Sequence, residues 1–147
     1  MGTKHKWSFY RSGGVDQIIF RGGADIAHLD QLDQKLWMAL SMPIRGTEFD
    51  PRTSDLLDTD HDGRIRPPEV LAAVRWAVAA FKDVGCLMRG GDRVPLDAIQ
   101  DPAILAGARR LLANLGKSDA GAVTLADVAD QTAIYAKTLF NGDGVVP

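Results

Sequence analysis

The segment that most constrains this chain is a stretch of twelve residues from Asp58 to Glu69. It carries aspartates at its first, third and fifth positions, a glycine at its sixth and a glutamate at its twelfth. Helix signals flank it on both sides. Asp50-Pro51 is a capping residue followed by a proline at the first helical position, and Pro67-Pro68 also fall in a first turn. The pattern therefore predicts a tight loop between two helices.

The acidic positions of this loop suit a hard cation that is bound by six to eight oxygen atoms. Side chains at alternate positions of a curled loop converge on one point, and Gly63 permits the positive φ of the sharp turn. Ile65 is expected to point into the core. Only two of the 19 acidic residues are glutamates, and one stands at the twelfth position, where the longer side chain can bind with both oxygens. The predicted metal ligands are Asp58, Asp60, Asp62, the backbone carbonyl of Arg64, and Glu69.

These residues match the EF-hand calcium loop over all twelve positions. The chain resembles a bacterial EF-hand calcium-binding domain protein and, more loosely, the N-terminal part of a larger protein; the specific resemblance covers residues 50–83. It implies Ca²⁺ as the bound ion and supplies no reaction. The alternative is a solvated acidic turn that only caps the following helix, but adjacent carboxylates without a cation would repel one another.

Two positions depart from the usual loop. Arg66 stands at the ninth position, where a short oxygen-bearing side chain usually holds a ligating water and caps the next helix. Arginine has no acceptor atom and adds positive charge beside the ion, so it predicts a weaker affinity. His61, at the fourth position, is expected to project outward rather than to bind the ion.

A second segment, residues 116–127, fits the same frame at its sixth, eighth and twelfth positions, which are Gly121, Val123 and Asp127. Its first and fifth positions, Gly116 and Ala120, have no side-chain oxygen, so this loop should not bind calcium. The resemblance implies a degenerate hand in which Ile65 and Val123 pair in a short antiparallel contact. The alternative is an ordinary loop followed by a capping box, Thr124–Asp127.

The remaining patterns predict a mainly α fold. It would combine an EF-hand-like pair of helix-loop-helix units, one complete and one degenerate, with an additional N-terminal helix and a short β-hairpin. Residues 140–147 match part of a further loop that stops before its twelfth position; they read equally well as a glycine-rich tail. The expected single domain, 1–147, comprises a hairpin (7–20), a helix (25–42), an EF-hand (50–83), a degenerate EF-hand (101–139) and a truncated half-loop (140–147).

Composition excludes several classes of function. A net charge of −2 gives no reason to expect nucleic acid or a membrane as partner, and the single Cys86 cannot form an internal disulfide. No apolar stretch of the signal-peptide kind opens the chain, which predicts a cytoplasmic location. The solitary thiol has no neighbouring base, and His5, His28 and His61 lack zinc-ligand spacing, so we expect no enzyme activity.

The expected function is calcium binding through one EF-hand loop that couples metal binding to helix packing, as a structural or regulatory module of a larger protein. The alternative is a calcium-dependent sensor or a protein–protein interaction domain that recognises a partner helix. The expected helix 67–81 is apolar on most sides, which leaves a protein partner or a downstream domain open. Sensors use methionine-rich grooves and paired working sites. Four methionines and one competent loop favour the first function.

Overall fold

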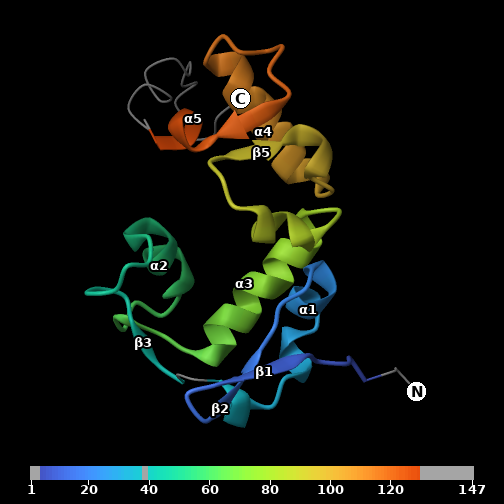
Figure 1. Ribbon diagram of the computed structural model, residues 1–147. Coiled ribbons are helices and arrows are strands. Elements are labelled where there is room, and N and C mark those ends of the chain that lie inside the picture. The colour runs from blue at the N-terminus through green and yellow to red at the C-terminus, as the bar shows by residue number, and fades with distance from the viewer. Residues whose placement is uncertain (1–3, 38–39, 130–147) are drawn as a thin grey trace. The chain divides into compact units, whose positions relative to one another are not determined.

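The computed structural model describes residues 4–37 and 40–129, and the chain divides into two compact units, residues 1–78 and 79–147 (Figure 1). We call them unit 1 and unit 2 and describe each by itself. The expectation that 1–147 forms a single domain stays a prediction. The segments 130–139 and 140–147, predicted to complete the degenerate hand and to form a half-loop, lie outside the described residues.

The described residues form a mixed α/β structure, so the prediction of a mainly helical fold with one hairpin is wrong. Three two-stranded antiparallel sheets are present in them. Two of the sheets were not predicted because their strands have only two or three residues, too few to show the alternation that marks a strand, and two strands contain proline. The pairs are β1 (Phe9–Ser12) with β2 (Val15–Ile18), β3 (Met42–Pro43) with β4 (Arg64–Ile65), and β5 (Arg93–Pro95) with β6 (Ala122–Thr124).

Helices of unit 1 are shorter near the N-terminus than the sequence suggests. The predicted continuous helix 25–42 is wrong, because Asp33 has an extended backbone and its carboxylate accepts the Lys35 amide at 3.0 Å, starting a new turn. In its place the structure has three short helices, α1 (Gly23–Ala27), η1 (Leu29–Gln31) and η2 (Gln34–Leu36). Two further helices, α2 (Pro51–Leu57) and α3 (Pro67–Ala80), flank the acidic loop, and the boundary between the units falls in the last turn of α3.

Helices of unit 2 are η3 (Val84–Arg89), η4 (Leu96–Ala98), α4 (Pro102–Asn114) and α5 (Leu125–Ala129). The start of α4 is capped by Asp101, whose carboxylate accepts the amides of the next turn. The helix ends in a Schellman motif, in which Gly116 has a φ of 74° and the Lys117 amide donates to the Leu112 carbonyl at 2.7 Å. Gly116 therefore stops α4, as its place in the sequence suggests.

The predicted pairing of Ile65 with Val123 is also wrong. Ile65 pairs with Met42, and Val123 pairs with Val94. Each partner lies roughly 20 or 30 residues earlier along the chain and within the same unit, so pairing closes a shorter loop and costs less chain entropy. Both units share one order of elements, namely a short strand, a helix, a loop, a second short strand and a further helix, and in unit 2 the short η4 also stands between β5 and α4.

Each unit has a small apolar core. Leu32 and Ile65 are buried in unit 1, as predicted for Ile65, and α1 lies alongside α3 (Figure 1). In unit 2 the fully buried side chain of α4 is Leu112, which packs in a core with other buried residues of the unit: Ala80, Val84, Ile99 and Ala122. None of the helices within the described ranges is long and apolar enough to cross a membrane.

Candidate metal centre

The loop between α2 and α3, residues 58–69, is closed by the side chain of Asp58. This carboxylate is buried, with 2% of its residue surface exposed, and it accepts the amides of Asp62 at 3.1 Å and Gly63 at 2.9 Å. Two residues in the loop adopt the left-handed backbone: His61, with φ 57°, and Gly63, with φ 83°. Histidine tolerates this conformation better than most side chains, and His61 is exposed, as predicted.

Glu69 folds back from the first turn of α3 onto both ends of the loop. Its Oε1 accepts the Thr59 amide at 2.9 Å, and its Oε2 accepts the Arg66 amide at 2.8 Å. The second contact is one half of a capping box, because Arg66 immediately precedes α3 and Glu69 is the third helical residue. The glutamate at the twelfth position therefore holds the loop and starts the helix.

Three of the predicted ligands come together. Asp58, Asp60 and Glu69 each offer an oxygen atom, and these atoms lie within 4.8 Å of one another. Asp58 and Glu69 are buried, while Asp60 is exposed. Among the described residues none of the three carboxylates takes part in an ion pair, and the hydrogen bonds they accept come from backbone amides and the Thr59 hydroxyl. Such an oxygen-only, anionic set fits a hard divalent cation.

Asp62 stands apart from this group. Its Oδ2 pairs with the guanidinium of Arg66, and its Oδ1 accepts the Arg64 amide at 2.9 Å. The hydrogen bond from Arg66 lowers the pKa of Asp62 and raises the pKa of the arginine. The side chain of Arg64 turns instead to the Ser41 hydroxyl, while its backbone lies in β4. The charge of Arg66 is evident from the sequence, but its partner Asp62 is not, because both residues lie outside a helix and the folded loop brings them together.

The second loop, residues 116–127, holds its acidic residue differently. Asp127 is buried, and its Oδ2 accepts the amide and the hydroxyl of Thr124, both at 2.8 Å. Its Oδ1 lies 2.5 Å from the ammonium Nζ of Lys117. The lysine, followed by the Thr124 hydrogen bonds, lowers the pKa of Asp127 to about 2. Lys117 was not singled out in the sequence, although it occupies the same second loop position as Thr59 in the first loop.

The turn of the second loop also differs from that of the first. Gly121 occupies the sixth position, but its backbone is not left-handed, whereas Gly63 at the sixth position of the first loop is. The left-handed glycine of this segment is Gly116, which ends α4. The second loop thus keeps the strand and the capping carboxylate of the frame, and it lacks the aspartates of the first, third and fifth positions.

A cavity of about 420 Å³ lies between α2 and α3, directly beside the first loop. Apolar side chains of both helices form most of its wall, and Leu56 is 81% exposed there. Thr59 and Glu69 belong to the wall and to the loop, so the cavity adjoins the predicted ligands. Its lining residues are Thr53, Leu56, Leu57, Thr59, Glu69, Ala72, Ala73 and Trp76.

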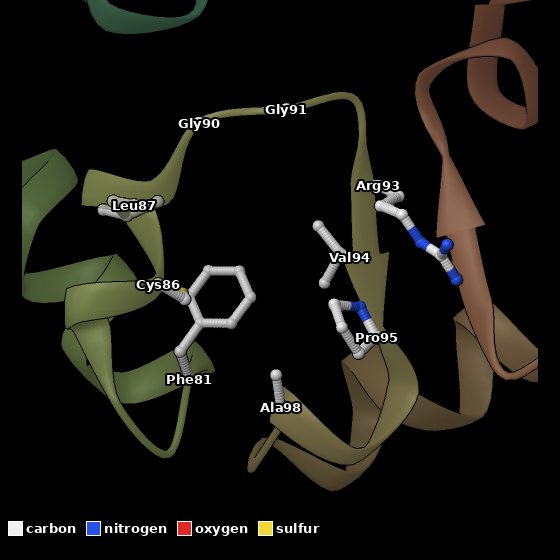
Figure 2. Close-up of a pocket in the computed structure, with 9 residues that line it drawn as sticks. All are labelled: Phe81, Cys86, Leu87, Gly90, Gly91, Arg93, Val94, Pro95 and Ala98. Atoms are coloured by element: carbon white, nitrogen blue, oxygen red, sulfur yellow. The ribbon is translucent and has the colours of Figure 1, made fainter.

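Cys86 lines a separate cavity of about 150 Å³ in unit 2, between η3 and β5. The thiol lies beside the ring of Phe81, and Val94 and Pro95 face it from the strand (Figure 2). Arg93 contributes to the wall, but its guanidinium points away from the cavity, toward β6 (Figure 2). Cys86 also lines a neighbouring cavity of about 490 Å³ whose wall includes the charged residues Lys82, Asp83, Arg89, Arg93 and Asp97. The cysteine therefore lies between an apolar wall and a charged one.

A third cluster ties the N-terminal segment to α1. The ring of His5 lies 2.6 Å through Nε2 from Asp25 and stacks on His28 with ring centroids 4.7 Å apart. Asp25 is buried, and the Arg21 amide, followed by His5, lowers its pKa. The three side chains anchor this segment, and sequence spacing alone gave no sign of them.

Comparisons of the chain with protein-family models, with curated proteins and with solved structures give no match. What the chain can do is therefore inferred from the two loops and their contacts.

Proposed function

We propose that this chain binds one calcium ion through residues 58–69, as a structural or regulatory module. The ligands would be the predicted set: Asp58, Asp60, Asp62, the carbonyl of Arg64, and Glu69. The observation that carries the proposal is a pair of buried carboxylates, Asp58 and Glu69, that have no ion-pair partner among the described residues and lie at the two ends of one loop. Burying negative charge is costly unless a cation balances it.

Binding at this place would couple the ion to helix packing. Asp58 directly follows α2, and Glu69 lies in the first turn of α3. One ion bound by both carboxylates would join the two helix ends, so its binding free energy would stabilise unit 1 in the folded state. In the unfolded chain the same ligands would lie far apart and would bind the ion much more weakly, so the ion would favour the folded state.

The test is a calorimetric titration of the chelator-treated protein with calcium. We expect one site, and we expect Glu69→Gln to weaken binding by more than about a hundredfold, because the twelfth position supplies two of the oxygens. Asp127→Asn is the matched control in the second loop: it should leave one site of unchanged affinity. An absence of binding at millimolar calcium, or two sites in the wild-type protein, would contradict the proposal.

A second candidate, a calcium-dependent sensor that recognises a partner helix, is favoured by the apolar cavity beside the loop. Thr59 and Glu69 contact each other and also line this cavity, so ligation by Glu69 would change its wall. A sensor should bind a hydrophobic dye much more strongly with calcium than without it. A structural module should gain thermal stability from calcium while its dye binding stays nearly constant.

A further inference from the structure

We propose that Arg66 is a tethered competitor of the metal ion, which raises the calcium concentration needed to fill the first loop. The inference rests on the proposed function and concerns its regulation. The guanidinium of Arg66 pairs with Asp62, the acidic residue that stands outside the group formed by Asp58, Asp60 and Glu69. In the structure, therefore, one of the four predicted carboxylates is engaged by a cation that belongs to the protein.

The fold fixes this competitor beside the loop. The backbone of Arg66 is held from both sides, because its amide donates to Glu69 Oε2 at 2.8 Å and its carbonyl accepts the Glu69 amide at 3.0 Å. Asp62 is held as well, through its own amide, which donates to Asp58. With both backbones fixed four residues apart, the arginine side chain meets the aspartate without any rearrangement of the loop.

The pair is also one that a divalent ion can displace. Asp62 and Arg66 are both partly exposed, with about 36% and 41% of their side-chain surface accessible. Exposed ion pairs are weak, and a doubly charged ion that gains several oxygens at once outcompetes a single guanidinium. The contrast is Lys117, whose partner Asp127 is buried and whose loop has no side-chain oxygen at the first and fifth positions, Gly116 and Ala120. Arg66 would therefore raise the calcium concentration at which the first loop fills. Lys117 would stay paired with Asp127 at any calcium concentration.

Removal of the competing side chain tests the inference. We expect Arg66→Gln to raise the calcium affinity about tenfold, because a ligand is freed and a positive charge near the ion is lost. Arg64→Gln is the charge-matched comparison: it removes the same formal charge from the same loop, but its guanidinium bonds Ser41 and not a carboxylate. Its backbone carbonyl is retained, so we expect a rise of less than about threefold.

Both affinities would be measured by calorimetry at one ionic strength, and NMR of the Arg66 guanidinium would follow its release during the titration. Calcium should free the guanidinium in the wild-type protein as the site fills. Equal gains for Arg64→Gln and Arg66→Gln, or a guanidinium signal unchanged at saturation, would overturn the inference while the proposed site stands. If neither the wild-type protein nor Arg66→Gln binds calcium at millimolar concentration, the proposed function fails and the inference with it. Binding by Arg66→Gln alone would contradict the proposed function of the wild-type chain and would support competition by Arg66 for the loop.

Discussion

The two loops, residues 58–69 and 116–127, occupy the same place in the order of elements of their units. In both, the carboxylate at the twelfth position accepts the amide at the ninth position and so caps the following helix: Glu69 accepts from Arg66, and Asp127 accepts from Thr124. In both, the other oxygen reaches back to the second position, which is Thr59 in one loop and Lys117 in the other.

The difference lies in what reaches the carboxylate from that second position. Thr59 donates its neutral backbone amide, whereas Lys117 donates its charged ammonium, because its own amide already bonds the end of α4. The second loop therefore carries its counter-charge within the chain. In the first loop Asp58 and Glu69 have no ion-pair partner among the described residues. The comparison teaches that a carboxylate at the twelfth position can cap the following helix in both loops while its second contact is neutral in one loop and charged in the other.

The largest expected effect is a stabilisation of unit 1 alone by calcium. At a free calcium concentration a hundred times the Kd, the amides of residues 58–70 should gain about 2.7 kcal/mol of protection against hydrogen exchange. The amides of residues 116–129 should gain none, since Lys117 already pairs with Asp127. Equal protection of both segments would contradict the expectation that calcium stabilises only the first loop.

Acid should destabilise the second loop, and the pH at which this happens depends on the ion pair between Lys117 and Asp127. The pKa of Asp127 is lowered to about 2, below its ordinary value near 3.8, so its stabilising contribution is complete above pH 4 and is lost as the pH falls toward 2. Hydrogen exchange of α5 should accelerate over that range. Lys117→Met should move the loss to higher pH, and an unchanged midpoint in this variant would show that the ion pair does not hold the loop.

The two sixth-position glycines offer a matched pair of substitutions. A Cβ atom added at Gly63 or at Gly121 would meet no atom within 4 Å, but only Gly63 has a left-handed backbone, with φ 83°. Gly63→Ala should therefore destabilise unit 1 by about 1–2 kcal/mol, and Gly121→Ala should change the stability of unit 2 by less than about 0.5 kcal/mol. Chemical denaturation monitored separately for each unit would measure both; similar losses would mean that the two turns do not differ.

The smallest expected effect concerns the feature that the units share, a capping aspartate before a proline. Asp101 accepts the amides of Ala103 at 2.8 Å and Ile104 at 3.0 Å, so Asp101→Ala should cost about 1 kcal/mol of stability in unit 2. Asp50→Ala should likewise destabilise unit 1, because the hydrogen bonds from the Thr53 amide and hydroxyl to Asp50 are lost. Asp101→Asn is the control, because asparagine caps nearly as well.

Local chemistry explains why parts of this protein could be read from its sequence. The starts of α2 and α4 coincide with Asp50-Pro51 and Asp101-Pro102, and the end of α4 with Gly116, because caps, prolines and left-handed glycines act within one helical turn. The capping box Thr124–Asp127 is present for the same reason. The twelve-residue frame likewise predicted the convergence of Asp58, Asp60 and Glu69, which depends on one short loop.

Strand pairing between residues far apart in the chain could not be predicted from the sequence. The partners of Ile65 and Val123 are Met42 and Val94, and neither partner segment is long enough to show a strand pattern by itself. The break in the stretch 25–42 has a local cause that its apolar spacing does not show. Asp33 starts a new turn by accepting the Lys35 amide, since side-chain bonds to the backbone compete with helix formation. The contacts of Arg66 and Lys117 with their aspartates depend on the tertiary structure, because the reach of a long charged side chain is set by the folded backbone around it.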